Sequence, residues 1–300
     1  MQKRIAIINS VCGTGSTGRI VNDLTIFLRA KGFDARIFFG RNPNRFKAPY
    51  AKCFSNYLDF LVHCLKTRLF DKSGFSSNHV TQKLIKELNQ FDPDLIIINN
   101  LHGYYLNINI LFNWIKNKNK KIILVCHDCW NFTGHCTHFS LKNCTKWKNG
   151  CYNCPAKKEY PSSLLLDNSK RNYEIKKDLY SNIKNLTVVC PSNWLANYAK
   201  ESFFSNREIV TIHNGVDTNL FKKTTGNFKK KYNLGNKKII LCIANMFDER
   251  KGLYDVIKLN QILSDNEVIV MVGQIKGKIE IPKNIIHIRR TDSIVQLVEI

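Results

Sequence analysis

The chain has 300 residues, which is enough for two domains of ordinary size with a substantial buried core. With 44% hydrophobic and 11% aromatic residues, the composition excludes an intrinsically disordered chain. The formal charge of +23 is spread along the sequence rather than gathered in one tail. Three interpretations of this charge stay open: an anionic membrane surface together with an anionic substrate, a lysine-rich composition without binding meaning, and nucleic acid.

Composition also bears on location. No apolar run approaches the roughly 18 residues that would span a bilayer. Residues 5–8 are apolar, but a glycine-rich turn follows them instead of a signal-peptide cleavage site. We therefore expect a cytoplasmic protein, with a peripheral position on the inner face of the membrane as an option. Eleven cysteines are an odd number, which argues against a disulfide framework in a reducing compartment.

The first elements predict a β-turn-α-β unit. Residues 4–9 have the pattern of a strand, residues 18–31 that of a helix capped by Thr17 or Ser16, and residues 35–40 that of a second strand. The turn at residues 13–18 spells GxGxxG, which can hold an anion against a helix N-terminus. A dinucleotide site would need an acidic residue after the second strand, where Arg41 stands. A phosphate or acceptor loop and a purely structural turn both remain possible.

Residues 56–69 predict a helix. Its apolar side chains recur at helical spacing, namely Leu58, Leu61, Val62, Leu65 and Leu69. A surface helix that packs this stripe on the core is the first expectation. The alternative is a helix whose apolar and basic flanks touch anionic lipid.

Two buried parallel strands are predicted at residues 95–98 and 122–125. His102 lies in the loop after the first, and His127 and Asp128 follow directly after the second. Ligands of open α/β sheets bind where parallel strands end. We therefore place the reacting centre at His127 and Asp128, with His102 as a second candidate or an ordinary loop histidine.

The loop at residues 128–161 is too long and too rich in Trp, Cys and His for a simple connector. It holds four cysteines within about twenty residues, which could bind a structural Zn²⁺: Cys136, Cys144, Cys151 and Cys154. His135 or His138 could replace one thiolate. A disulfide or two, and a reduced packed cluster, are the alternatives.

The second domain is expected to begin after Ser205, so that the domains cover residues 1–205 and 206–300. Asn214 follows a predicted strand at residues 209–213. Arg250 and Lys251 precede a helix that opens at Gly252, which makes either an anion site or a solvated basic turn. About three or four βα units fit into this part, too few for a typical doubly wound domain, so we expect the second domain to be incomplete and the chain to be C-terminally truncated.

The order of motifs resembles that of the retaining glycosyltransferases of GT-B fold, in particular the "glycosyl transferases group 1" family. The residues that carry the resemblance are the first strand with Gly13–Arg19, His127, Pro191–Leu195, Ile212–Asp217 and Asp248–Gly252. The stretch from His127 to Trp130 with Phe132–Cys136 is similar to a bacterial capsule or exopolysaccharide subgroup. The resemblance covers nearly the whole chain.

The resemblance implies two Rossmann-like doubly wound α/β domains and transfer of a sugar from a nucleotide-sugar donor to a glycan or lipid-linked acceptor in cell-envelope polysaccharide synthesis. It also implies that His127 lies beside the reacting sugar and that Lys251 binds the donor diphosphate, because each matches a family residue with that role. Together with the predicted strand ends and turns, we expect His127 and Asp128 to be catalytic and His102 and Arg19 to lie on the acceptor side. The expected donor-binding residues are Gly15, Ser16, Asn214, Arg250 and Lys251. No cofactor is expected for catalysis, and no nucleic acid partner.

Two other hypotheses for the function remain open. One is a catalytically inactive, truncated remnant that binds nucleotide or sugar. The other is a basic, zinc-containing nucleic-acid-binding protein, which should show a steep salt dependence of binding.

Overall fold

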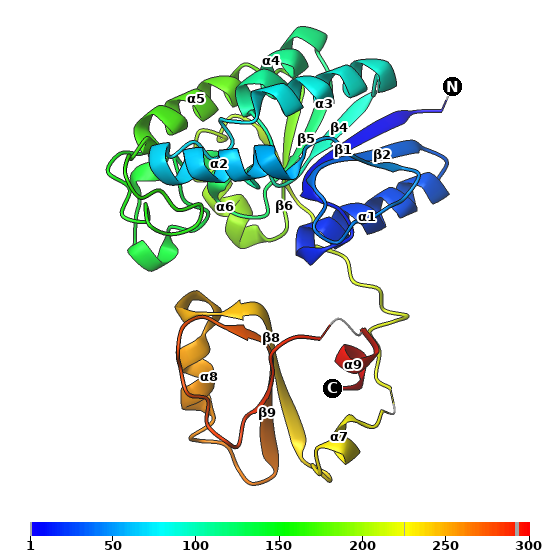
Figure 1. The fold of residues 1–300 in the computed structure, drawn as a ribbon, viewed down its shortest axis with the longest axis vertical. Coiled ribbons are helices and arrows are strands. Elements are labelled where there is room, and N and C mark those ends of the chain that lie inside the picture. The colour runs from blue at the N-terminus through cyan, green and yellow to red at the C-terminus, as the bar shows by residue number, and fades with distance from the viewer. Residues whose placement is uncertain (1, 225, 292–293) are drawn as a thin grey trace. The chain divides into compact units, whose positions relative to one another are not determined.

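The computed structural model describes residues 2–224, 226–291 and 294–300. The chain forms two compact units, the first ending at Gly215 and the second beginning at Val216 (Figure 1). None of the helices in the described ranges is long and apolar enough to cross a membrane.

The first unit is a parallel sheet covered by helices on both faces. Its strands are β1 (Arg4–Val11), β2 (Asp34–Arg41), β3 (Ala51–Cys53), β4 (Leu95–Ile98), β5 (Lys121–Val125), β6 (Leu186–Cys190) and β7 (Glu208–Thr211). Its helices are α1 (Gly15–Ala30), α2 (Tyr57–Phe70), α3 (Asn78–Phe91), α4 (Ile108–Lys118), α5 (Ser169–Ser181) and α6 (Asn193–Glu201).

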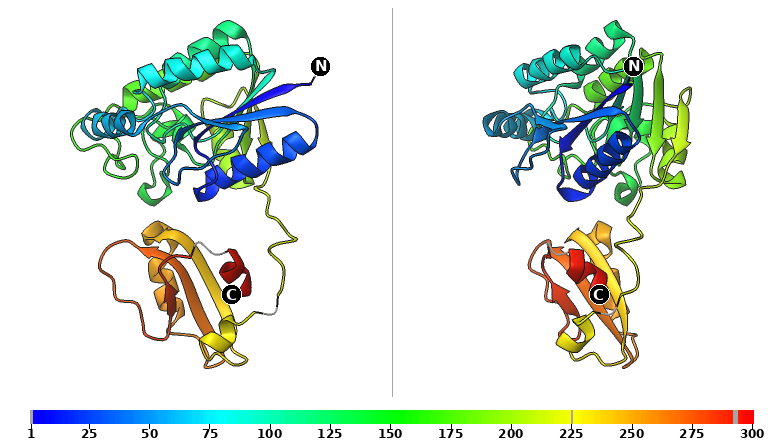
Figure 2. Two further views of the ribbon diagram at one scale, coloured as in Figure 1. Left: turned by 45° about the vertical axis from the view of Figure 1, so that its right-hand side comes forward. Right: turned by 90° about the vertical axis from the view of Figure 1, so that its right-hand side faces the viewer.

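The strand order is β3-β2-β1-β4-β5-β6-β7, with every pair parallel. Side chains alternate between the two faces, as a strand requires. In β1, Ile5 and Ile7 pack in the cluster that contains Val21 of α1, whereas Ala6 and Ile8 pack with the helices α3 and α4. The helices accordingly lie on opposite faces of the sheet (Figures 1 and 2).

The second unit has its own smaller sheet and core. The parallel strands β8 (Lys238–Phe247), β9 (Glu267–Ile275) and β10 (Ile286–Ile288) are ordered β10-β9-β8. The helices α7 (Phe228–Lys231), α8 (Leu253–Leu259) and α9 (Ile294–Glu299) accompany them, with a 3₁₀ turn, η4 (Glu249–Lys251), before α8. Residues of β9 alternate between a cluster with Phe228 and a cluster with Leu253.

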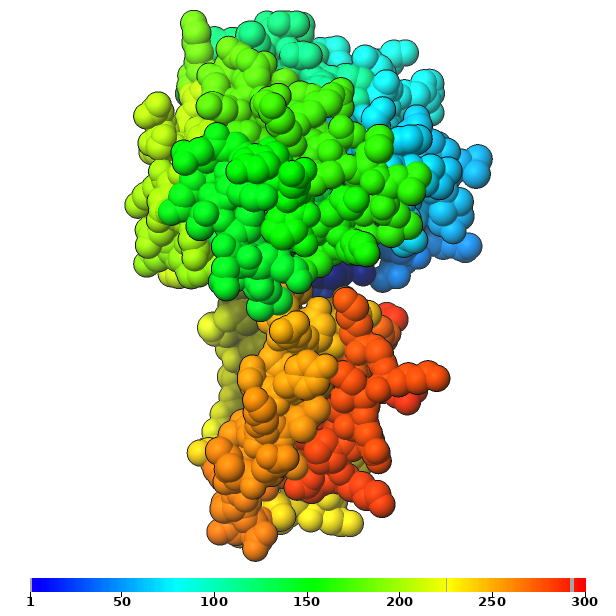
Figure 3. All heavy atoms as spheres, turned by 90° about the vertical axis from the view of Figure 1, so that its left-hand side faces the viewer, coloured from blue at the N-terminus to red at the C-terminus, as the bar shows by residue number. Residues whose placement is uncertain are grey.

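The cysteine-rich loop is a folded part of unit 1. Three 3₁₀ turns run through it: η1 (Trp130–Phe132), η2 (Ser140–Lys142) and η3 (Lys146–Lys148). Trp130 and Trp147 are almost fully buried. The loop covers much of one face of the unit, where it is coloured green (Figure 3). Close packing at Gly134, where a Cβ would come 2.0 Å from the carbonyl oxygen of Ser169, fixes its path.

Two local expectations were wrong. Strand β7 was expected to open the second domain, but it pairs with β6 at the edge of the first sheet, and the units divide after Gly215 rather than after Ser205. Helix α1 begins at Gly15 rather than Gly18, and its N-cap is Thr14 without a side-chain cap hydrogen bond. The glycines allow this early start, since Gly13 and Gly15 both have positive φ.

Candidate active site

The sheet of unit 1 has a topological switch point. The chain runs from β1 outward to β2 and β3, then returns to β4 on the other side of β1. Ligands of such sheets bind outside the carboxyl ends of the strands at this point. Asn9 joins the two strands there, because its Oδ1 accepts the backbone N–H of Asn100 at 3.2 Å and its Nδ2 donates to the carbonyl of Val11 at 2.7 Å.

His102 and Asp128 meet at this edge. The loop after β4 carries His102 and the loop after β5 carries Asp128, and the His102 Nε2 lies 2.7 Å from the Asp128 Oδ2. The second carboxylate oxygen accepts the backbone N–H of Trp130 at 2.9 Å. Burial opposes ionisation of Asp128, but the charge and hydrogen bond of His102, together with the Trp130 N–H, outweigh it and lower the pKa of Asp128. The carboxylate is therefore held ionised and oriented.

Tyr160 completes this group from the far end of the cysteine-rich loop. Its hydroxyl lies 3.2 Å from the Nδ1 of His102 and 3.4 Å from the His102 carbonyl. Its ring packs edge-on against those of His102 and Tyr104. Burial raises the pKa of Tyr160 to about 12, which keeps the hydroxyl protonated. Both ring nitrogens of His102 are thus engaged by protein groups.

His127 stands beside this pair with a fixed tautomer. Its Nε2 donates to the Oδ1 of Asn99 at 3.0 Å, which leaves Nδ1 as the acceptor nitrogen. Burial lowers the pKa of His127, and the negative charge of Asp128, which acts in the other direction, offsets only part of this effect. A neutral imidazole with a lone pair on Nδ1 can accept the proton of a substrate hydroxyl or orient it.

Lys176 of α5 supports this region from behind. It is fully buried, its Nζ donates to the carbonyl of Trp130 at 2.7 Å, and the same ammonium lies 3.5 Å from the centroid of the Trp130 ring. Burial lowers the pKa of Lys176 to about 7. Because Trp130 donates its backbone N–H to Asp128, Lys176 helps to fix the carboxylate.

The glycine-rich turn follows β1 at the same edge. Gly13 donates its N–H to the carbonyl of Gly18 at 2.9 Å, which closes the turn. Gly15, Ser16 and Arg19 are exposed in the first turns of α1, and a Cβ built on Gly15 would meet no atom within 4 Å. Free N–H groups at this end of α1 are available to an anion.

In unit 2, cations gather at the carboxyl ends of the strands. Arg250 and Lys251 are exposed in η4, directly after β8, and the backbone N–H of Lys251 donates to the Oδ1 of Asp248 at 3.0 Å. The helix expected to open at Gly252 does so: Gly252, with a positive φ of 69°, is the N-cap of α8 and follows η4 directly. A pocket of about 590 Å³ lies past the ends of β9 and β10, and its lining includes Lys278 and Arg289. Asn214 is exposed in the segment before the unit begins.

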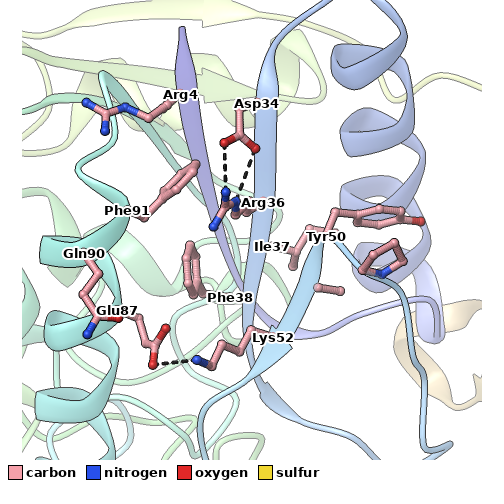
Figure 4. Close-up of a pocket in the computed structure, with 12 residues that line it drawn as sticks. Arg4, Asp34, Arg36, Ile37, Phe38, Tyr50, Lys52, Glu87, Gln90 and Phe91 are labelled. Carbon is pink, nitrogen blue, oxygen red and sulfur yellow. Dashed lines mark hydrogen bonds and ion pairs between the residues drawn. The ribbon is translucent and has the colours of Figure 1, made fainter. Parts of the chain in front are cut away.

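A second pocket, of about 400 Å³, belongs to the other end of the first sheet. Arg4 and Asp34, the first residues of β1 and β2, line it together with residues of β3 and α3 (Figure 4). Arg36 is paired with Asp34 at 3.0 Å, and Lys52 is paired with Glu87 at 2.6 Å. Neither Arg36 nor Lys52 lies at the edge where His102 and Asp128 meet.

The four cysteines predicted as zinc ligands, Cys136, Cys144, Cys151 and Cys154, are free thiols. Cys154 is hydrogen-bonded to Cys136, and this contact lowers the pKa of Cys154. His135 is held by Asp71 at 2.6 Å through Nδ1, while its buried Nε2 has no hydrogen-bond partner among the described residues. The structure shows no group of three or more His, Cys, Asp or Glu residues in residues 2–224, 226–291 and 294–300 that could hold a metal ion as they stand. Zinc binding therefore stays a prediction, and it requires the thiols to move together around the ion.

Sequence reasoning missed three residues of this site. Asn99, Tyr160 and Lys176 orient the predicted ones, yet none belongs to a recognisable motif. Asn99 alone had a signal, since it directly follows a predicted buried strand. Tyr160 and Lys176 are brought to the site by the path of the loop and by the packing of α5.

Two solved structures share the architecture of the chain. Sucrose-phosphate synthase of Thermosynechococcus elongatus matches 99% of the chain and 73% of its own length, with a TM-score of 0.63 and 13% identity. HepE of Anabaena, in complex with UDP and glucose, matches 92% of the chain and 62% of its own length, with a TM-score of 0.55 and 12% identity. The predicted fold class is confirmed: the chain has a GT-B fold.

Sequence similarity identifies the family of the chain. The family model described as Glycosyltransferase Family 4 matches residues 17–220, more than half of the chain, and the chain belongs to this family. It is 27% identical over 157 residues to WcaC of Escherichia coli (strain K12), whose name assigns it as a glycosyl transferase to colanic acid biosynthesis. That alignment covers 50% of the chain and 37% of WcaC, so the chain spans little more than a third of this curated relative.

Proposed function

We propose that the chain is a glycosyltransferase that moves a sugar from a nucleotide-sugar donor to a glycan or lipid-linked acceptor in cell-envelope polysaccharide synthesis. The observation that carries this proposal is the arrangement of His102, Asp128 and His127 at the carboxyl edge of the sheet, at its switch point. Membership of the family supports it. HepE, a structure of the same fold, was solved with UDP and glucose.

In this proposal unit 1 binds the acceptor. The Nδ1 of His127 accepts a hydrogen bond from the attacking hydroxyl and orients it. Asp128 follows His127 directly in the sequence. Its ionised carboxylate stabilises the positive charge that develops on the sugar in the transition state. His102 and Trp130 hold the carboxylate in place and do not themselves exchange a proton with substrate.

Unit 2 binds the donor diphosphate. Departure of a nucleoside diphosphate develops negative charge on its oxygens, and fixed cations stabilise that charge. Arg250 and Lys251 are exposed and stand at the end of β8, so both can reach phosphate oxygens. Within unit 1, Gly15 and Ser16 offer backbone N–H groups to a phosphate, and Arg19 offers a cation on the acceptor side.

Equilibrium titration tests the donor assignment. A panel of nucleotide sugars and free nucleoside diphosphates is titrated into the parent chain and into an Arg250→Ala, Lys251→Ala double variant. A loss of affinity of about tenfold or more is expected, since charge-assisted hydrogen bonds contribute about 1.5–3 kcal/mol each. The matched control is Lys237→Ala with Lys238→Ala, which removes two cations at the amino end of β8.

Equal affinity of the parent and the double variant for every nucleotide would overturn the donor assignment. Donor binding that is lost in the double variant, without turnover of any donor, would support instead a remnant that only binds nucleotide or sugar.

A further inference from the structure

Helix α2 buries polar side chains and exposes apolar ones, which is the reverse of an ordinary surface helix. Only His63 and Thr67 are buried, and both are polar. Six of its large apolar side chains are exposed instead, by 40–74% of their area, while Phe60 and Leu69 are half-buried; the exposed ones are Tyr57, Leu58, Leu61, Val62, Leu65 and Phe70. The spacing of Leu58, Leu61, Val62 and Leu65 places them on one face, so this stripe points into solvent. The expectation that it packs on the core was wrong.

A buried hydrogen-bond chain fixes this orientation. The backbone N–H of Gly74 donates to the Nε2 of His63 at 3.2 Å, and the Nδ1 of His63 donates to the Oγ of Ser77 at 2.7 Å. Ser77 in turn donates to the Oδ2 of Asp59 at 2.6 Å. Rotating the helix to bury its leucines would break these hydrogen bonds and leave the polar groups unpaired, which is unfavourable.

A second element extends the apolar surface. The segment from Leu164 to Leu166 runs along the end of α2, where Leu164 donates its backbone N–H to the carbonyl of Arg68 at 2.7 Å and Leu166 donates to the carbonyl of Leu69 at 3.1 Å. Leu164, Leu165 and Leu166 are exposed by 56%, 63% and 49%. We call the combined surface the leucine patch: Leu58, Leu61, Val62, Leu65 and Leu164–Leu166.

The charges around the leucine patch are positive. Exposed cations on the same two elements and their flanks are Lys66, Arg68, Lys158 and Lys170. The acidic residues nearby are occupied within the protein: Asp59 by Ser77, Asp71 by His135, Glu159 by Lys142, and Asp167 by the backbone N–H groups of Cys154 and Ser169. An apolar stripe bordered by Lys and Arg matches the boundary between acyl chains and anionic headgroups. A second copy of this chain is disfavoured as the occupant, because its basic surface would repel this one.

We propose that the leucine patch docks unit 1 on an anionic membrane surface. The surface lies near the candidate active site, because the segment that carries Leu164 also carries Tyr160, whose hydroxyl contacts His102. A docked chain would therefore hold the acceptor side of unit 1 close to the lipid. This inference goes beyond the proposed transfer reaction, and docking requires no turnover.

Vesicle sedimentation tests the proposal with the full chain. The parent is expected to bind vesicles of equal parts phosphatidylglycerol and phosphatidylcholine, and to bind pure phosphatidylcholine weakly. Leu58→Gln with Leu65→Gln should weaken binding at least about tenfold, because two leucine side chains leave the acyl boundary. Lys66→Gln with Arg68→Gln should weaken it by about fivefold for each charge and reduce its salt dependence.

The matched control is Phe27→Gln with Ile262→Gln, two exposed apolar residues outside the leucine patch, which should bind like the parent. All replaced side chains are exposed, so the folded state is expected to persist, and thermal unfolding confirms it. Equal binding of the leucine double variant and the parent would overturn the proposal. It would also be overturned if the parent is dimeric and the leucine double variant monomeric, since a second copy would then cover the leucine patch.

Discussion

The replacement Asp128→Asn probes the central pair of the site with little change of shape. In the parent, Asp128 accepts one hydrogen bond from His102 and one from the backbone of Trp130. The asparagine oxygen can still accept the Trp130 N–H, but its amide nitrogen then faces the Nε2 of His102. The histidine must lose its Nε2 proton to accept this bond, so its tautomer reverses and its Nδ1–H turns toward Tyr160.

The expected loss follows from these contacts. A hydrogen bond to a charged group contributes about 1.5–3 kcal/mol, which corresponds to about ten- to hundredfold in rate. The negative charge beside the reacting sugar is lost as well, so we expect the upper part of this range. The loss should fall on kcat, because the donor cations Arg250 and Lys251 are unchanged, and KM for the donor should stay near that of the parent.

The assay is the initial rate of sugar transfer over a range of donor concentrations, with thermal unfolding measured in parallel. The control is Asp23→Asn, an exposed aspartate of α1, which should leave kcat unchanged. If Asp128→Asn folds and keeps the parent kcat, the carboxylate has no part in the reaction and the site is misassigned.

Three further outcomes are expected. Burial lowers the pKa of His63 from its ordinary value of 6.5 to about 3, so the unfolded chain binds a proton that the folded chain does not. The free energy of unfolding, measured by urea titration, should therefore fall as pH drops below 6.5, and His63 should contribute about 1.4 kcal/mol per pH unit to that slope. His63→Gln should remove this contribution; an unchanged slope contradicts the buried neutral imidazole. Gly134→Ala should cost about 3 kcal/mol or more by urea unfolding, because its methyl meets backbone at 2.0 Å, while Gly215→Ala, in open space, should cost little. If the cysteine-rich loop binds zinc, elemental analysis finds about one ion per chain that Cys151→Ser with Cys154→Ser removes; a metal-free, stably folded parent refutes the zinc prediction.

The sequence predicted the parts of the fold that depend on short-range pattern. Apolar runs located the strands β1, β4, β5 and β6, because strands buried on both faces need continuous apolar residues. Their carboxyl ends then placed His127 and Asp128 at one edge with His102. The three-residue strand β3 carries too little pattern to be found.

Helix α2 shows where such reasoning ends. A stripe of leucines at helical spacing has the same periodicity whether it faces the core or solvent. His63 on the opposite face decides between the two, through its hydrogen bond to Ser77 before α3, which no local pattern reveals. The roles of Tyr160 and Lys176 were missed for the same reason, since each acts on the site through a contact with residues distant in sequence.

The assignment of strand β7 also depended on pairing. Residues 209–213 were recognised as a strand, but a parallel strand can extend either of two sheets. Backbone pairing with β6 decided for the first. Sequence pattern locates an element better than it selects the neighbour of that element.

Acceptor-dependent release of a nucleoside diphosphate from a nucleotide sugar is the measurement that tests the proposed function most directly. The parent chain is incubated with each donor of a panel, with and without an envelope glycan or lipid-linked acceptor, and both products are quantified. The account predicts that one donor yields diphosphate and glycosylated acceptor in equal amounts, and that Asp128→Asn and Lys251→Ala each reduce both. Binding of nucleotide sugars without release of diphosphate from any of them, under conditions where the chain is folded, would contradict it.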